Sequence, residues 1–260
     1  MEAAELGTLM FSICVTGALL YSRVSPLRSL PLSLTEKAAV MGVIVATTTF
    51  FIIRSPYGRR SGAHLNPAIT VAYLWLGRVH PWDAVNYVVA QFVGGLAGVF
   101  LASQVLGHHL SAEPVRYVVT LPGEYGRPIA FLAEFLLSAL LMGIVLHATN
   151  HRRLARLSPL FVALITVFYY ALCPSISGFS VNPARNFSSA FFAWIWQGIW
   201  IYFAAPCLGM LAAAAVYIRS MGPGRVYCAK VFHDLTSPCP FRCRFAELMA
   251  NAGELTAERK

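Results

Sequence analysis

Residues 61–68 read Ser-Gly-Ala-His-Leu-Asn-Pro-Ala, and residues 177–184 read Ser-Gly-Phe-Ser-Val-Asn-Pro-Ala. The two copies lie 116 residues apart, counted from Asn66 to Asn182. Asn is a favoured helix N-cap, Pro suits the first helical position because its φ is preset, and Ala continues a helix at no entropy cost. Each copy therefore predicts a helix that starts at Asn-Pro-Ala and is preceded by a non-helical strand.

The helices that start at these motifs are predicted to be too short to cross a membrane. Apolar sequence continues over 66–76 and 182–194. About eleven helical residues rise about 17 Å, roughly half of a 30 Å hydrocarbon core. Short apolar segments at matching positions in two halves of a chain indicate a conduction or binding site at the middle of the bilayer.

The composition of the whole chain is that of a membrane protein. It is 57% hydrophobic and 12% charged, whereas soluble domains carry about 25% charged residues. Apolar runs near the ~20 residues of a membrane span occur six times. We expect an all-α integral membrane protein with six transmembrane helices and two half-membrane helices, the spans being roughly 4–22, 37–54, 83–106, 128–148, 157–173 and 198–219.

The charged residues indicate how the chain is oriented. Glu2 and Glu5, rather than basic residues, precede the first apolar run, which predicts a first span and not a cleavable signal peptide. The net charge of +9 is spread over short connections and the tail, so we expect no nucleic-acid partner. Fourteen Lys and Arg residues fall on the side of the termini and six on the other. Both termini are therefore predicted to be cytoplasmic, in a multi-pass protein of the cell membrane.

The two halves of the chain form a predicted inverted repeat. Tyr87, Gly94 and Ala97 recur 115 residues later as Tyr202, Gly209 and Ala212. Three spans and one half-helix per half make an odd number of crossings, so the second half inserts upside down. The predicted units are a first repeat (1–106), a linker loop (107–127), a second repeat (128–219) and a cytoplasmic tail (220–260).

Two half-helices that meet N-terminus to N-terminus would place about half a positive charge each at the middle of the bilayer. The strands before them can lie at that depth only if their carbonyls line a polar cavity. We expect a pore with Asn66 and Asn182 at its centre and with a carbonyl strand formed by Gly62, Ala63, His64, Gly178 and Ser180. Water would pass along the carbonyls, and cations would meet a positive barrier.

With both motifs nearly intact, the chain resembles the aquaporin or major intrinsic protein family over about residues 1–220. The context Arg59-Arg60-Ser61 and the tail are similar to a bacterial branch. The resemblance implies a passive water channel and a homotetramer with one pore per subunit. The small residues Gly94, Gly95 and Gly98 are expected to permit the close packing of helices that the tetramer needs.

The resemblance also implies a constriction around Arg185, the residue that follows the second motif. The other constriction positions fall at Phe179, at Tyr170 or its neighbour Tyr169, and at Val45 or Ala46. The pore and selectivity residues implied in this way, together with the motifs, are Asn66, Pro67, Ala68, Asn182, Pro183, Ala184, Arg185, Phe179, Tyr170, Val45 and Ala46.

These constriction residues depart from the usual patterns of the family. Water channels generally have His where Tyr170 stands, whereas glycerol channels share the Phe of Phe179. Ala190, the pair Tyr202-Phe203 and Asn186 (where glycerol channels have Asp) are similar to water channels. We expect a water channel, with a channel for glycerol or another small neutral solute as the alternative and an ion-coupled transporter as a distant one.

The resemblance assigns Glu5 and Glu134, the acidic members of two Ala-Glu pairs, as structural anchors for the strands before the half-helices. An enzyme would need a nucleophile–base pair or a metal cluster within the spans. The sequence offers neither in the predicted spans, so no enzyme activity and no cofactor are expected.

The tail carries Cys228, His233, Cys239 and Cys243. Three thiols and an imidazole could form a tetrahedral zinc site, but their spacing is irregular. We expect free thiols and no bound metal, with a zinc site or a redox pair of Cys239 and Cys243 as alternatives. Cys14, Cys173 and Cys207 lie in apolar runs and are expected to be packing residues.

Overall fold

The computed structural model describes residues 1–234 and 236–250, in which the regular elements are helices. Six of the helices in these ranges are long and apolar enough to cross a membrane. The all-α membrane fold with six spans is therefore confirmed. The spanning helices are α1 (Glu2–Tyr21), α2 (Leu34–Arg54), α5 (Pro81–Leu106), α7 (Gly126–Thr149), α8 (Ser158–Leu172) and α11 (Ile199–Met221).

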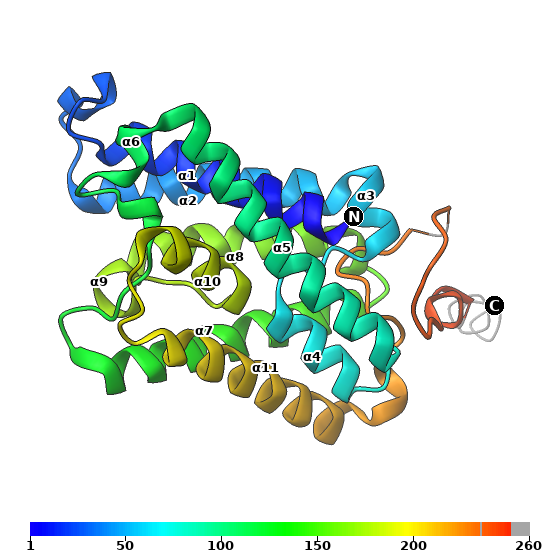
Figure 1. Ribbon diagram of the computed structural model, residues 1–260. Helices are drawn as coiled ribbons and strands as arrows, with labels where there is room; N and C mark the ends of the chain where they lie inside the picture. Colours follow the sequence, from blue (N-terminus) through cyan, green and yellow to red (C-terminus); the bar gives the residue numbers. More distant parts are fainter. Residues whose placement is uncertain (235, 251–260) are drawn as a thin grey trace.

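Short helices connect the spans. The two that begin at the motifs are α4 (Pro67–Trp75) and α10 (Pro183–Ala193), which enter the bundle from opposite ends (Figure 1). The remaining ones are η1 (Pro26–Ser29), α3 (Pro56–Ser61), α6 (His108–Ser111), η2 (Arg116–Val118), η3 (Ala155–Leu157), α9 (Pro174–Ser177) and η4 (Pro223–Arg225).

The spanning helices pack in matching pairs. Helix α1 lies against α5, α7 lies against α11, and α2 lies against α8. A Cβ at Gly94 would lie 2.1 Å from the Ala3 carbonyl oxygen of α1, and one at Gly209 would lie 2.2 Å from the Phe135 carbonyl oxygen of α7. Because real Cβ atoms do not approach so closely, both contacts require glycine.

The glycines of α5 correct one expectation about the tetramer. A Cβ at Gly98 would lie 2.2 Å from the Gly7 oxygen of α1, and one at Gly95 would lie 2.3 Å from the Ser188 hydroxyl of α10. Together with Gly94, these residues pack helices inside the subunit, so they carry no argument for contacts between subunits.

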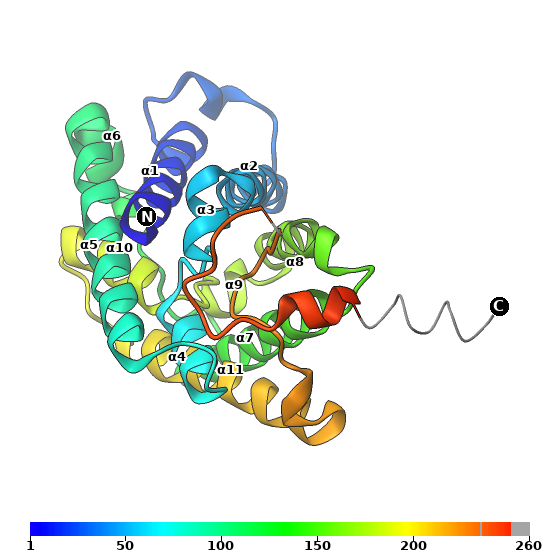
Figure 2. The same ribbon diagram turned by 90° about the vertical axis from the view of Figure 1, so that its right-hand side faces the viewer.

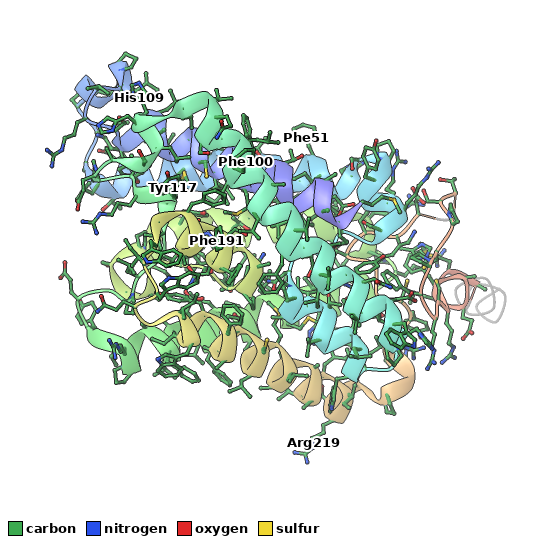
Figure 3. All side chains as sticks on the ribbon, in the orientation of Figure 1. Phe51, Phe100, His109, Tyr117, Phe191 and Arg219 are labelled. Carbon is green, nitrogen blue, oxygen red and sulfur yellow. The ribbon has the colours of Figure 1, made fainter. Side chains whose placement is uncertain are left out.

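Large apolar side chains cover the outside of the bundle. Phe51 on α2 is 65% exposed and Val89 on α5 is 56% exposed. Figure 3 shows Phe51 on the outer surface of a span and Arg219 at the end of α11, pointing away from the bundle. An apolar outer face suits the lipid chains that a spanning helix meets.

The chain after α11 folds back onto the bundle. Residues 226–234 and 236–241 run across the middle of the ring of helices, at the end where residue 1 also lies (Figure 2). Cys228, Ala229, Lys230 and Val231 are all at most 3% exposed. These residues of the predicted tail therefore pack against the bundle.

Candidate pore and its constriction

The strands before the half-helices have the same unusual backbone. Ala63 and Leu65 have φ of 54° and 52°, and Phe179 and Val181 have φ of 52° and 48°. Non-glycine residues rarely adopt this left-handed region, and such strain is typical of functional sites. The repetition at matching positions indicates that both strands are held in one particular shape.

Each half-helix is capped by its own asparagine and tied to the opposite strand by the same side chain. Asn66 Oδ1 accepts from Ala68 N at 2.9 Å, and its Nδ2 donates to the Val181 oxygen at 2.8 Å. Asn182 Oδ1 accepts from Ala184 N at 3.1 Å, and its Nδ2 donates to the Leu65 oxygen at 2.7 Å. The two helix N-termini therefore meet through a reciprocal pair of hydrogen bonds.

Buried carboxylates hold the strands from behind. Glu134 accepts hydrogen bonds from the Ser177 hydroxyl (2.8 Å), Ser180 N (3.0 Å) and Val181 N (2.6 Å). A carboxylate can accept several hydrogen bonds at once, so one side chain fixes the shape of the whole strand.

In the first half Glu5 shares the role of anchor with Glu2. His64 N and Leu65 N donate to Glu2 at 2.9 and 2.8 Å, and the Ser61 hydroxyl donates to Glu5 at 2.7 Å. Sequence reasoning missed Glu2 because only Glu5 stands in an Ala-Glu pair. The spacing of the two was a signal, since side chains three residues apart share one face of a helix.

A cavity of about 100 Å³ runs beside the asparagines. Asn66, Asn182, Ala63, His64 and Ser180 are among the residues that border it. By the measure in which about 10–15 Å³ holds one water molecule, this cavity has room for a short file of waters. It is the candidate pore.

Four residues named from the sequence surround one part of this cavity: Val45, Tyr170, Phe179 and Arg185. The rings of Tyr170 and Phe179 meet edge to face with centroids 4.9 Å apart. A second cavity of about 310 Å³ is bordered by Tyr170, Arg185, Gly178 and the linker residues Thr120 and Leu121. Tyr170 and Arg185 border both cavities, so the predicted constriction lies where the two cavities meet.

The structure also decides between the alternatives for two positions. Val45 borders the pore cavity, whereas Ala46 lies in an outer groove between α2 and α8 with Phe50 and Leu160. The hydroxyl of Tyr169 donates to the Leu137 oxygen at 2.7 Å and so points to α7. Ala46 and Tyr169 are therefore not constriction residues.

Arg185 presents a buried positive charge to the pore. Its residue is 5% exposed, and the Tyr170 hydroxyl faces its guanidinium. Among the described residues, Nη1 of Arg185 has no hydrogen-bond acceptor. A guanidinium cannot lose its proton in a protein, so this N–H is a permanent donor beside the constriction.

Three groups of residues that were predicted to line the pore do not border the pore cavity. Gly62 is not among the residues that border the cavity. Its carbonyl oxygen accepts a hydrogen bond from Val231 N at 2.9 Å and is therefore not free to face the pore. Gly178 borders the larger cavity instead. The other residues of the motifs form the first helical turns behind the asparagines, namely Pro67, Ala68, Pro183 and Ala184.

The four metal-ligand candidates of the tail come together in space. The sulfurs of Cys228, Cys239 and Cys243 and a ring nitrogen of His233 all lie within 4.8 Å of one another. The neighbouring Cys228 sulfur outweighs burial and lowers the pKa of Cys239 and of Cys243 below the ordinary value of a thiol. The irregular spacing in sequence thus concealed a compact cluster, in which the three cysteines form no disulfide.

Comparison with known proteins assigns the family. The profile of the major intrinsic protein family matches residues 2–217, and the chain belongs to this family. The family consists of membrane channels for water or small solutes, so the chain is a multi-pass channel protein and not an enzyme.

Individual relatives agree with this assignment. A probable NIP-type aquaporin of Nicotiana alata is 34% identical over 69% of this chain, which spans 64% of that protein's length. Aquaporin Z of Bradyrhizobium diazoefficiens is 27% identical over 83% of this chain and 90% of its own. The aquaglyceroporin of Plasmodium falciparum has the same fold, with a TM-score of 0.69 at 20% identity over 86% of this chain and 96% of its own.

Proposed function

We propose that the chain is a passive water channel whose constriction at Tyr170, Phe179, Val45 and Arg185 excludes glycerol. The observation that carries the proposal is the pair of rings, Tyr170 and Phe179, packed at 4.9 Å beside Arg185. Two aromatic side chains and a guanidinium on one short stretch of wall leave room for a single file of small molecules.

The proposed path supplies hydrogen bonds along its length. Among the described residues, the carbonyl oxygens of Ala63, His64, Phe179 and Ser180 accept no backbone or side-chain hydrogen bond. They are therefore available to water, with the Arg185 guanidinium as a donor beside the constriction. A file of waters can exchange partners along such a wall without an unpaired polar group.

Cations and protons are opposed by positive charge at two levels. The half-helices α4 and α10 each place about half a positive charge at their N-termini. Arg185 adds a full charge at the constriction, and no carboxylate among the described residues forms an ion pair with it. We propose that this barrier, and not pore diameter alone, excludes ions.

The orientation and assembly of the channel belong to the same proposal. The excess of Lys and Arg on the side of the termini favours a cytoplasmic location for the tail and for both termini, in the cell membrane. We propose a homotetramer with one pore per subunit, as the resemblance to the family implies.

Stopped-flow light scattering on proteoliposomes tests the proposal. An osmotic step in an impermeant sugar is expected to give fast shrinkage with a low activation energy. A step in glycerol is expected to give re-swelling no faster than in empty liposomes. Fast glycerol re-swelling would overturn the proposed exclusion and make the protein a glycerol channel.

A further inference from the structure

The segment after α11 borders one end of the pore cavity through Val231. Val231 borders the pore cavity, its N–H donates to the Gly62 oxygen, and its oxygen accepts from the Ser158 hydroxyl at 2.6 Å. The Ala229 oxygen lies 2.9 Å from His64 Nε2. These contacts join the segment to the pore strand and to the start of α8, on opposite sides of the mouth. We call residues 226–245, apart from residue 235, the cap.

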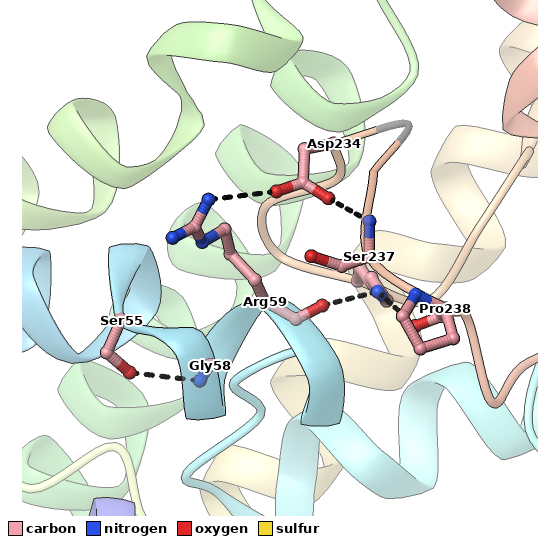
Figure 4. A network of polar contacts seen from close by, with 7 residues as sticks. Ser55, Gly58, Arg59, Asp234, Ser237 and Pro238 are labelled. Atoms are coloured by element: carbon pink, nitrogen blue, oxygen red, sulfur yellow. Dashed lines mark hydrogen bonds and ion pairs between the residues drawn. The ribbon is translucent and has the colours of Figure 1, made fainter.

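Buried polar contacts hold the cap in place. Lys230 is fully buried, and its ammonium donates to the Arg59 oxygen and, at 2.9 Å, to the Pro238 oxygen. Asp234 pairs with Arg59 at 3.3 Å and accepts from Ser237 N at 2.8 Å (Figure 4). Each of these contacts stabilises the cap only while the cap keeps its shape.

The cap has little regular structure with which to keep that shape. Its residues before 245 form loops rather than a helix. Segments of fewer than about 40 residues seldom build a sufficient apolar core, and disulfides or metal ions usually supply the missing stability. The cluster of Cys228, His233, Cys239 and Cys243 lies within the cap and joins its beginning to its end.

The geometry of the cluster is that of a tetrahedral metal site. Ligand atoms about 2.3 Å from a common ion lie about 3.8 Å apart. The sulfurs of Cys228 and Cys239 are 3.5 Å apart, and His233 Nε2 lies 3.1 Å from the Cys243 sulfur. One ion at the centre could contact all four atoms after small shifts.

The surroundings of the sulfurs also suit metal-bound thiolates. The backbone N–H of Phe245, two positions later in the chain, donates to the Cys243 sulfur at 3.5 Å. Such contacts stabilise negative sulfur and orient the ligand. The His233 ring stacks on Phe245 at 4.3 Å, which fixes its plane.

We propose that Cys228, His233, Cys239 and Cys243 bind one zinc ion, and that the ion holds the cap closed over the mouth of the pore. Three thiolates and one imidazole form a set that selects zinc over calcium or magnesium, which take oxygen ligands. A single disulfide would use two of the three sulfurs and leave His233 without a role. The second half of the proposal, closure, rests on the proposed channel function, whereas the metal site does not.

Metal analysis of the full chain, purified in detergent under reducing conditions, tests the site. After incubation with zinc and removal of the excess, mass spectrometry is expected to find one zinc per chain. The double variant Cys239→Ser/Cys243→Ser should hold almost none, and Cys207→Ser, a cysteine of α11, is the matched control. Wild-type protein without zinc after this treatment would overturn the proposal. Because that measurement needs no variant, misfolding of the double variant cannot hide the answer.

Water flux through proteoliposomes tests the closure. A membrane-permeant chelator is expected to raise the osmotic water permeability of the zinc-loaded protein several-fold, and added zinc should restore the low value. The double variant should have the high value with or without chelator. Unchanged flux despite zinc release would overturn the closure. Absence of flux with and without the chelator, in a protein that holds one zinc per chain before the chelator is added, would instead overturn the proposed function and leave the metal site standing.

Discussion

In the second half of the molecule one carboxylate, Glu134, accepts hydrogen bonds from Ser177, Ser180 and Val181. In the first half Glu2 and Glu5 divide the three corresponding contacts. Tyr87 and Tyr202 nevertheless donate to the matching oxygens of Ser61 and Ser177, at 2.6 and 2.7 Å. The backbone geometry of the two strands is therefore conserved between the halves while the side chains that impose it differ.

The halves differ more strongly at the two ends of the pore. Three residues beyond the motif asparagine, the first half has Ile69 and the second half has Arg185, and both border the pore cavity. The first strand is covered by the cap, whereas the second faces a cavity of about 310 Å³. The repeated features thus border the pore cavity, and we propose that the unrepeated ones determine what passes.

The largest expected effect concerns the carboxylates that hold the two strands, Glu134 in the second half and Glu5 in the first. Glu134→Gln should cost about 3 kcal/mol of unfolding free energy, because glutamine places a donor against a strand N–H that then lacks an acceptor. Glu5→Gln should cost less than about 1 kcal/mol, since the Ser61 hydroxyl can still donate to the amide oxygen. Denaturant titration in detergent, followed by circular dichroism, measures both. Equal losses would show that Glu134 is not the sole anchor of its strand.

The second prediction concerns a substitution that gives the second half the residue of the first half, Ile69, at the position of Arg185. Arg185→Ile should raise glycerol permeability about tenfold, equivalent to about 1.4 kcal/mol, because it removes a large side chain from the wall. Proton leakage should rise as well, since the positive barrier is lost. Glycerol re-swelling and a pH-sensitive dye in proteoliposomes report the two fluxes, and Ile69→Val is the control. If both fluxes stay at the wild-type level, Arg185 does not set selectivity.

The smallest expected effect concerns Asn66 and Asn182, which make equivalent hydrogen bonds in the two halves. Aspartate at Asn66 or Asn182 keeps the helix cap but cannot donate to the opposite strand. Asn66→Asp and Asn182→Asp should therefore each lose one hydrogen bond, about 1 kcal/mol of stability, and by the same amount. The same titration compares them. A clearly larger loss for one variant would mean that the reciprocal bonds are not equivalent.

Local rules predicted the half-helices well. The first was expected over 66–76 and spans Pro67–Trp75, because capping by Asn and Pro depends on neighbouring residues alone. The six spans could also be predicted, because the hydropathy of a segment depends only on the residues within it. The resemblance placed Tyr170, Phe179 and Arg185 correctly beside one cavity.

Features that depend on distant contacts could not be predicted. Glu2 acts as an anchor because of the rotation of α1 against a strand about sixty residues later. The cap lacks periodicity, so nothing in its sequence indicates that Val231 reaches Gly62. Gly42 is a further example, since a Cβ there would lie 2.7 Å from the Tyr170 Cβ, a contact that exists only once α2 and α8 are packed.

The reciprocal bonds of Asn66 and Asn182 have a consequence for biosynthesis. The amide of Asn66 finds its acceptor on Val181, which lies 115 residues later in the chain. At about 5–20 residues per second, that acceptor is made some 6–23 s after the asparagine. During this interval the first half-helix lies in the translocation machinery or the bilayer, capped by Asn66 Oδ1 but with the Asn66 amide group lacking its acceptor. Neither half can therefore mature alone, and the pore becomes a finished structure only when the second repeat has been inserted.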